Sequence, residues 1–177
     1  MICFDGGYVM EYEYVTTIGQ DSHRFAEGEN PSGTIKLGGY DVPYGRAYSA
    51  NSDGDVILHA ITNAISGLTG INILGGRADE LCLGQGIRDS RVYLKEGLKD
   101  LAAIPGAQIT YVSMSIECLA PKLKEHIPGI KSSVGEILGL SPSRVGITAT
   151  TGEHLTGMGN GDGIQVFAAV TFKLPAS

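Results

Sequence analysis

The chain has 177 residues, 42% of them hydrophobic, and a formal net charge of −6. This length can bury one good core and is short for two domains, so we expect a single domain over residues 1–177. The negative charge argues against nucleic acid or an anionic membrane as a partner. An anionic ligand would have to be held by metal ions, backbone N–H groups or a few well-placed cations.

Cysteine usage and the N-terminal sequence indicate the compartment. Cys3, Cys82 and Cys118 are an odd number without Cys-x-x-Cys spacing, which predicts neither a disulfide framework nor a cysteine zinc site. The N-terminus lacks the basic start and continuous apolar core of a signal peptide, and polar residues interrupt the longest apolar tract, 56–74. We therefore expect a soluble, cytoplasmic protein, with an organelle still open if a targeting peptide has been removed.

Hydrophobic periodicity and turn residues predict the elements in chain order. They are a strand over 12–17, a hairpin over 33–45 turning at Gly38-Gly39, helices over 53–68, 89–104 and 127–140, and strands over 108–118, 144–151 and 163–174. Ser52 or Asp53 is expected to cap the first helix, and Asp89 or Ser90 the second. Residues 69–88 have weak periodicity and predict a long, functional loop. Because strands and helices do not alternate strictly, we expect an α+β fold, a mixed sheet with helices packed on one face.

The first helix and the segment "QDSHRF" (20–25) carry the residues best suited to bind a metal. On the helix, Asp55, His59 and Asn63 lie four residues apart and share a stripe at the border of the buried face. Asp21 and His23 lie two apart, so on an extended segment they point to the same side. Two imidazoles and a carboxylate can serve as three of the four ligands of a tetrahedral zinc ion, which leaves one coordination position open. The alternative is a buried, hydrogen-bonded histidine, and spacing alone leaves both interpretations open.

Two further stretches could bind phosphate or a base. "ITATTGEHLTGMGNGDGI" (147–164) ends a strand in hydroxyls, followed by an acidic residue and several glycines that could present N–H donors. "CLAPKLKEHIP" (118–128) leaves a strand through Ala120-Pro121, with Lys122 and Lys124 beside it. A fixed turn there could expose its backbone to a base edge. A plain glycine-rich turn and an ordinary strand-to-helix connection remain the alternatives.

Taken together, four blocks resemble the 2-C-methyl-D-erythritol 2,4-cyclodiphosphate synthase family. They are "DSHRF", "NSDGDVILHA", "APKLKEHIP" and "TATTGEHL…GDGI", the second being the most specific. The resemblance extends from about residue 16 to 173 and leaves residues 1–12 as an N-terminal extension. It favours the metal interpretation of Asp21, His23 and His59.

The resemblance implies a homotrimer with active sites at the subunit interfaces. The implied substrate is 4-diphosphocytidyl-2-C-methyl-D-erythritol 2-phosphate, whose 2-phosphate attacks the β-phosphorus of its own diphosphate. The reaction releases CMP and closes the ring of a cyclic diphosphate. An anionic nucleophile meets an anionic phosphorus here, so catalysis depends on positioning and charge neutralisation.

The resemblance also implies roles for individual residues. Asp21, His23 and His59 would hold zinc, and Glu153 would hold magnesium or manganese between the α- and β-phosphates. Thr151 and Asn51 occupy catalytic positions. The remaining implied substrate-binding residues are Ser22, Ser52, Asn72, Ile73, Leu74, Asp79, Cys118, Leu119, Ala120, Pro121, Lys122, Leu123, Lys124, Thr150, Gly152, Gly157 and Asn160.

The chain departs from the family pattern at several of these positions. Asn51 replaces a histidine that can carry charge, and charge-assisted hydrogen bonds are roughly twice as strong as neutral ones. Asn63 replaces an acidic residue, leaving a carbonyl that could orient His59. Asn72 stands in place of a ribose-binding aspartate. Gly152, Gly157 and Asn160 replace a threonine, a phenylalanine and an arginine. These changes leave open a paralogue that is non-catalytic or has an altered substrate.

Overall fold

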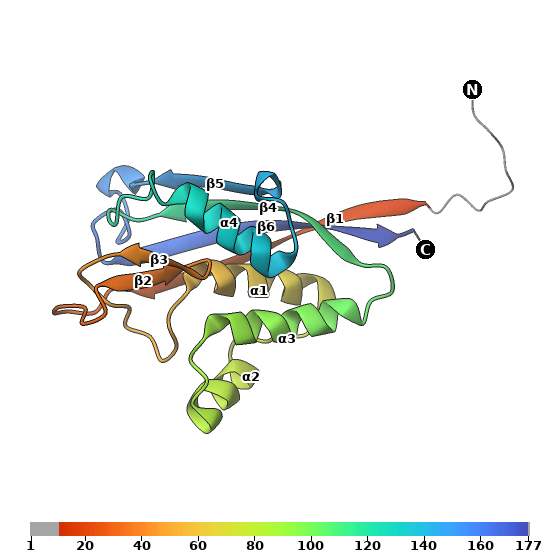
Figure 1. Ribbon diagram of the computed structural model, residues 1–177, viewed down its shortest axis with the longest axis horizontal. Helices are drawn as coiled ribbons and strands as arrows, with labels where there is room; N and C mark the ends of the chain where they lie inside the picture. Colours follow the sequence, from red (N-terminus) through yellow and green to blue (C-terminus); the bar gives the residue numbers. More distant parts are fainter. Residues whose placement is uncertain (1–10, 177) are drawn as a thin grey trace, which may run out of the picture.

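The computed structural model describes residues 11–176, which form a mixed α+β fold around a four-stranded sheet (Figure 1). The sheet has the order β1-β6-β4-β5, and a separate hairpin pairs β2 with β3. Only β4 and β5 run parallel; the other neighbouring strands are antiparallel. The strands are β1 Tyr12–Arg24, β2 Thr34–Leu37, β3 Tyr40–Pro43, β4 Gln108–Glu117, β5 Val145–Thr150 and β6 Gly163–Pro175.

The helices confirm the prediction that one face of the sheet is covered. They are α1 Val56–Thr69, α2 Gly76–Asp79, α3 Ser90–Ala102 and α4 Ile127–Leu138, with a π-helix over Glu80–Gly84 and short 3₁₀ turns over Pro142–Arg144 and Gly152–His154. In Figure 1, α1 lies directly against the sheet, α3 lies beneath α1, and α2 is farthest from the strands. None of the described helices is long and apolar enough to cross a bilayer.

Alternation along the strands builds the core between sheet and helices. On β6, Ile164, Val166, Ala168 and Val170 are fully buried beneath the helices, whereas Phe167 lies on the opposite face. From α1, the predicted stripe of Ile57, Ile61 and Ile65 enters the same core and is fully buried. The strict alternation fixes which face of each strand meets α1.

The other face of the sheet has no covering layer in the described chain. Ile18 is 71% exposed there and Phe167 is 49% exposed. Ser113 of β4 pairs with Ala169 of β6 on this face, so small and apolar side chains continue across the sheet. An open, partly apolar sheet face of this kind is typical of an interaction surface.

The predicted start of the first helix and the predicted loop over 69–88 were wrong. The first helix begins at Val56, and Asp55 caps it by accepting from the Leu58 N–H at 3.1 Å, so neither Ser52 nor Asp53 is the cap. Gly54 has a left-handed φ of +68°, which stops the helix from extending back. The predicted loop over 69–88 contains α2 and the π-helix, which are anchored by a small cluster of Ile73, Ala78, Cys82 and Tyr93. These turns are too short to leave a periodic signal in the sequence.

Candidate active site

β1 and α1 bring together the three residues predicted to bind a metal. Asp21 and His23 are on the face of β1 that contacts α1, in register with buried Val166 and Ile164 of β6. α1 approaches β1 closely at Gly19, where an added Cβ would lie 2.0 Å from the Ala60 carbonyl oxygen. This approach places His59, the next residue back along α1, directly opposite the two strand residues.

The ligand atoms of the triad converge on one point. Asp21 Oδ2 is 3.0 Å from His59 Nδ1 and 3.1 Å from His23 Nε2, and the two ring nitrogens are 3.2 Å apart. A tetrahedral ion with ligands at about 2.0–2.1 Å places neighbouring ligand atoms about 3.3 Å apart. The triad is already near this spacing, and the strand and helix that carry it are rigid elements. The predicted convergence of Asp21, His23 and His59 is confirmed as a group that could hold a metal ion.

The triad is electrostatically coupled even without an ion. Burial is the largest effect on Asp21 and disfavours its charge. Hydrogen bonds and charges from His23 and His59 together outweigh that burial and lower the pKa of Asp21 from 3.8 to about 2. Asp21 therefore stays ionised over the whole physiological range, as a metal ligand must be.

The lowered pKa predicts a pH-dependent contribution to the stability of the metal-free protein. A depressed carboxyl pKa stabilises the fold above the unfolded value of about 3.9, and this contribution is lost as pH falls through about 2. We expect Asp21→Asn to lower the unfolding free energy by about 2 kcal/mol at pH 5. The difference in unfolding free energy between wild type and Asp21→Asn should shrink as the pH falls towards 2, as measured by urea titration of chelator-treated protein. A gap that stays constant from pH 5 to pH 2 would contradict this pairing.

Asp41→Asn is the matched control for that series. Asp41 is an exposed carboxylate paired with Lys36 at 2.9 Å. Exposed pairs contribute about 0–1 kcal/mol, so this variant should stay within that range at every pH.

The triad opens into a pocket of about 310 Å³. Four more of the predicted site residues line it, and they come from the turn before α1 and from the segment 69–88: Asn51, Ser52, Leu74 and Asp79. Ile73 does not, because its side chain is fully buried in the small cluster beneath α2. Its predicted role in binding the substrate stays a prediction, and its side chain packs into this cluster. Asn72 is exposed next to this cluster and is not part of the pocket lining.

A second pocket of about 310 Å³ lies where β4 and β5 end. It contains seven of the predicted site residues: Cys118, Pro121, Lys122, Leu123, Lys124, Thr150 and Thr151. Leu119 and Ala120 lie between the lining residues, and the Leu119 N–H donates to the Met158 carbonyl at 3.0 Å. Burial raises the pKa of the Cys118 thiol to about 11, so the pocket holds a neutral thiol beside two lysines.

The glycine-rich segment after β5 holds the other predicted residues. Glu153 is exposed, has a left-handed φ of +49°, and is outside the described group that could hold a metal. A side chain at Gly152 would be strained, because the backbone φ is +64° and the Glu117 carboxylate, 2.0 Å from an added Cβ, would have to move. Ser22 and Gly157 line a third pocket of about 320 Å³, which shares His23 with the triad pocket, while Asn160 is exposed nearby.

One part of the site has no local signal in the sequence. Ser90, the first residue of α3, is fully buried, and its hydroxyl lies 2.8 Å from His59 Nε2. The predicted partner, Asn63, instead donates to the Gln20 carbonyl at 3.0 Å. Asp89 and Ser90 predict only a helix start, because nothing local in a sequence says that α3 packs against α1.

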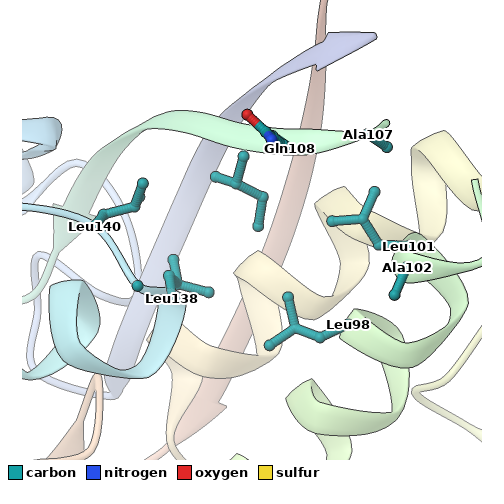
Figure 2. Close-up of a pocket in the computed structure, with 9 residues that line it drawn as sticks. Leu98, Leu101, Ala102, Ala107, Gln108, Leu138 and Leu140 are labelled. Atoms are coloured by element: carbon teal, nitrogen blue, oxygen red, sulfur yellow. The ribbon is translucent and has the colours of Figure 1, made fainter. Parts of the chain in front are cut away.

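A further pocket, of about 360 Å³, lies away from these residues (Figure 2). In Figure 2, Leu98, Leu101 and Ala102 of α3 lie across from Leu138 and Leu140. Its described lining is apolar apart from the Gln108 side chain and the backbone. This lining offers no group for acid–base or metal chemistry, so the pocket is not the candidate site.

Comparisons with known proteins agree with the geometry. The 2-C-methyl-D-erythritol 2,4-cyclodiphosphate synthase of Chlamydia muridarum is 46% identical over 161 residues, covering 91% of this chain and 89% of that protein. A solved synthase of the same name in its CDP-bound form is 29% identical with a TM-score of 0.74, covering 88% of this chain and 98% of that one.

The bifunctional IspDF of Campylobacter jejuni reaches a TM-score of 0.80 at 27% identity over 93% of this chain. The chain spans 43% of that longer protein. The model of the YgbB family matches residues 14–173. With the fold, the triad and these matches in agreement, the chain belongs to the YgbB family.

Proposed function

We propose that the protein cyclises 4-diphosphocytidyl-2-C-methyl-D-erythritol 2-phosphate to 2-C-methyl-D-erythritol 2,4-cyclodiphosphate with release of CMP. This is a phosphorus–oxygen lyase reaction of isoprenoid biosynthesis. The observation that carries the proposal is the convergence of Asp21, His23 and His59 in a pocket, within a chain 46% identical to a protein of that name. The match over 14–173 supports a single domain with residues 1–12 as an extension, and residues 1–10 lie outside the described structure.

Zinc fits the triad better than a hard cation such as magnesium. Two imidazole nitrogens and one carboxylate oxygen are borderline ligands, and they leave a fourth tetrahedral position open. When bound, zinc would neutralise and polarise a phosphate oxygen at that position. The three side chains would hold the diphosphate end of the substrate against the rigid β1–α1 junction.

The other residues of the triad pocket would orient the substrate. Asn51 and Ser52 lie at the rim of the triad pocket, where an amide and a hydroxyl can donate hydrogen bonds to the reacting phosphates. Leu74 and Asp79 also line this pocket and would meet the methylerythritol and ribose parts. Asn51 can donate but cannot carry charge, so its stabilisation of the transition state would be weaker than that of a histidine.

The second pocket would bind the cytidine end. The backbone from Cys118 to Lys124 would read the cytosine, and the hydroxyls of Thr150 and Thr151 would donate to phosphate. Glu153 follows directly and would hold magnesium or manganese between the two phosphates. Lys122 and Lys124 are exposed at this pocket and add positive charge beside the nucleotide.

A homotrimer would unite these two half-sites. The residues that line the triad pocket and the β4–β5 pocket do not overlap in the described chain. The open sheet face with exposed Ile18 and Phe167 offers a surface for other copies to cover. We therefore propose three composite sites, each built from one protomer's triad pocket and its neighbour's nucleotide pocket.

The decisive assay follows CMP release and product formation by phosphorus NMR. Protein loaded with one zinc per chain and supplied with magnesium or manganese should release one CMP for each cyclic diphosphate formed. Treatment with a chelator should abolish turnover, and added zinc should restore it. Zinc binding without CMP release, in conditions where the Chlamydia muridarum relative turns over, would overturn the proposal.

The same assay decides between the enzyme and a non-catalytic paralogue. The latter would be stabilised by CDP without releasing CMP from the substrate. The relatives that match this chain over most of its length carry the synthase name, which favours the enzyme. A cytoplasmic location stays a prediction.

A further inference from the structure

The geometry points to Ser90 and Asp53 as positioning residues that set the hydrogen-bonding state of the His59 ring, so that Nδ1 presents a bare lone pair to the metal. This inference rests on the proposed zinc site and adds to it a support from a different helix. His59 belongs to α1, Ser90 begins α3, and Asp53 lies in the turn before α1. A chain of hydrogen bonds joins the three residues.

The direction of each hydrogen bond follows from what the groups can donate. Both carboxylate oxygens of Asp53 accept hydrogen bonds from Ser90. The Ser90 backbone N–H donates to Oδ2 at 3.2 Å, and the Ser90 hydroxyl donates to Oδ1. The hydroxyl has a single hydrogen, and the bond to Asp53 uses it. At 2.8 Å from His59 Nε2, the Ser90 oxygen must therefore accept, so Nε2 carries the hydrogen.

Because Nε2 is engaged with Ser90, the other ring nitrogen, Nδ1, is the atom that can bind a metal. A neutral imidazole with its hydrogen on Nε2 has an unshared lone pair on Nδ1. Nδ1 is the atom that lies 3.0 Å from Asp21 Oδ2 and 3.2 Å from His23 Nε2. Without a metal, the contact with Asp21 is a hydrogen bond that Nδ1–H donates to the Asp21 carboxylate. A metal ion would take the place of that hydrogen and bind the Nδ1 lone pair, while Nε2–H keeps its hydrogen bond to Ser90. The Ser90–Asp53 pair thus prepares His59 to bind a metal.

The pair is held in place by the packing of two segments far apart in the sequence. The Asp53 N–H donates to the Arg88 carbonyl at 2.8 Å, which ties the turn before α1 to the residues before α3. Ser90 is fully buried and Tyr93, one turn later, lies with its ring centroid 6.0 Å from that of His59. A carboxylate that reaches a metal-bound histidine through a hydroxyl is a variant of the usual carboxylate–histidine–metal arrangement.

Ser90→Ala and Asp53→Asn test the inference through metal binding, without recourse to turnover. Loss of such outer partners lowers metal affinity by about 10–100-fold. We expect both variants to show this loss in zinc competition with a chromophoric chelator. The visible absorption of the cobalt-substituted protein should also shift, because the His59 ring is no longer fixed. Ser90→Thr, which keeps the hydroxyl, should restore most of the affinity.

Ser66→Ala is the matched control. Ser66 is a buried serine on α1 whose hydroxyl has no hydrogen-bond partner among the described residues. Its loss should leave zinc affinity and the cobalt spectrum at the wild-type values. Thermal unfolding of each metal-free variant separates a loss of fold from a loss of ligand positioning.

The outcomes separate this inference from the proposed function. Wild-type affinity and spectrum in folded Ser90→Ala and Asp53→Asn would overturn the positioning role and leave the zinc site standing. A wild-type chain that binds no zinc would overturn both. Weakened binding in both variants, with Ser66→Ala unchanged, would support the inference.

Discussion

His59→Ala is expected to abolish zinc retention and CMP release while leaving the protein folded. His59 supplies one of three ligand atoms, and its loss leaves Asp21 and His23 as a two-ligand site. Losing an outer partner alone costs about 10–100-fold in affinity, so losing a ligand should cost more than about 100-fold. Zinc content after dialysis and CMP release under saturating substrate measure the two effects.

His126→Ala is the control for that variant. His126 is a half-buried histidine at the start of α4, beside Tyr40, and outside the metal-binding group. It should retain one zinc per chain. If His59→Ala kept both zinc and turnover, the triad would not be the catalytic metal site.

Gly19→Ala should produce the largest loss of stability among small substitutions on β1. The added Cβ would lie 2.0 Å from the Ala60 carbonyl oxygen and 2.4 Å from the Ala64 nitrogen, both of them backbone atoms of α1. α1 cannot yield locally there, so it must move away from β1. We expect a loss of about 3 kcal/mol or more in urea unfolding, at the upper end of overpacking effects. Zinc affinity should also fall, because His59 moves with α1.

Gly67→Ala provides the comparison on the same helix. Its Cβ would meet Thr17 on β1 at 3.4 Å, which is an ordinary contact. Alanine also favours the helix over glycine by up to about 1 kcal/mol. This variant should match or exceed wild-type stability. Equal effects of the two substitutions would contradict the close approach at Gly19.

Periodicity predicted the sheet and the long helices because their side chains alternate between core and solvent. β4, β6 and α4 agree with the predicted ranges to within two residues. β1 runs on to Arg24, beyond the predicted end at residue 17, because its pairing with β6 continues past the apolar stretch. The start of α1 was predicted too early because four polar residues in "NSDGD" could each cap a helix, and only the fold selects Asp55.

Local patterns marked Asp21, His23 and His59 as candidate ligands, and the resemblance to the synthase family favoured the metal interpretation over a buried, hydrogen-bonded histidine. Asp-x-His on an extended segment places both side chains on one face, and the first helix positions His59 at its buried border. The residues that contact and orient the triad could not be predicted from local patterns. Ser90 contacts His59 only because α3 packs on α1, and Asn63 is diverted to the β1 backbone. The separation of the two pockets likewise depends on tertiary geometry.

The most direct test is a crystal of the protein soaked in zinc, with anomalous diffraction recorded at the zinc edge. The account predicts one peak per chain within about 2.0–2.2 Å of Asp21 Oδ2, His23 Nε2 and His59 Nδ1. His59 Nε2 should remain hydrogen-bonded to the Ser90 hydroxyl. A peak elsewhere, or ligation through His59 Nε2 with Ser90 displaced, would contradict it.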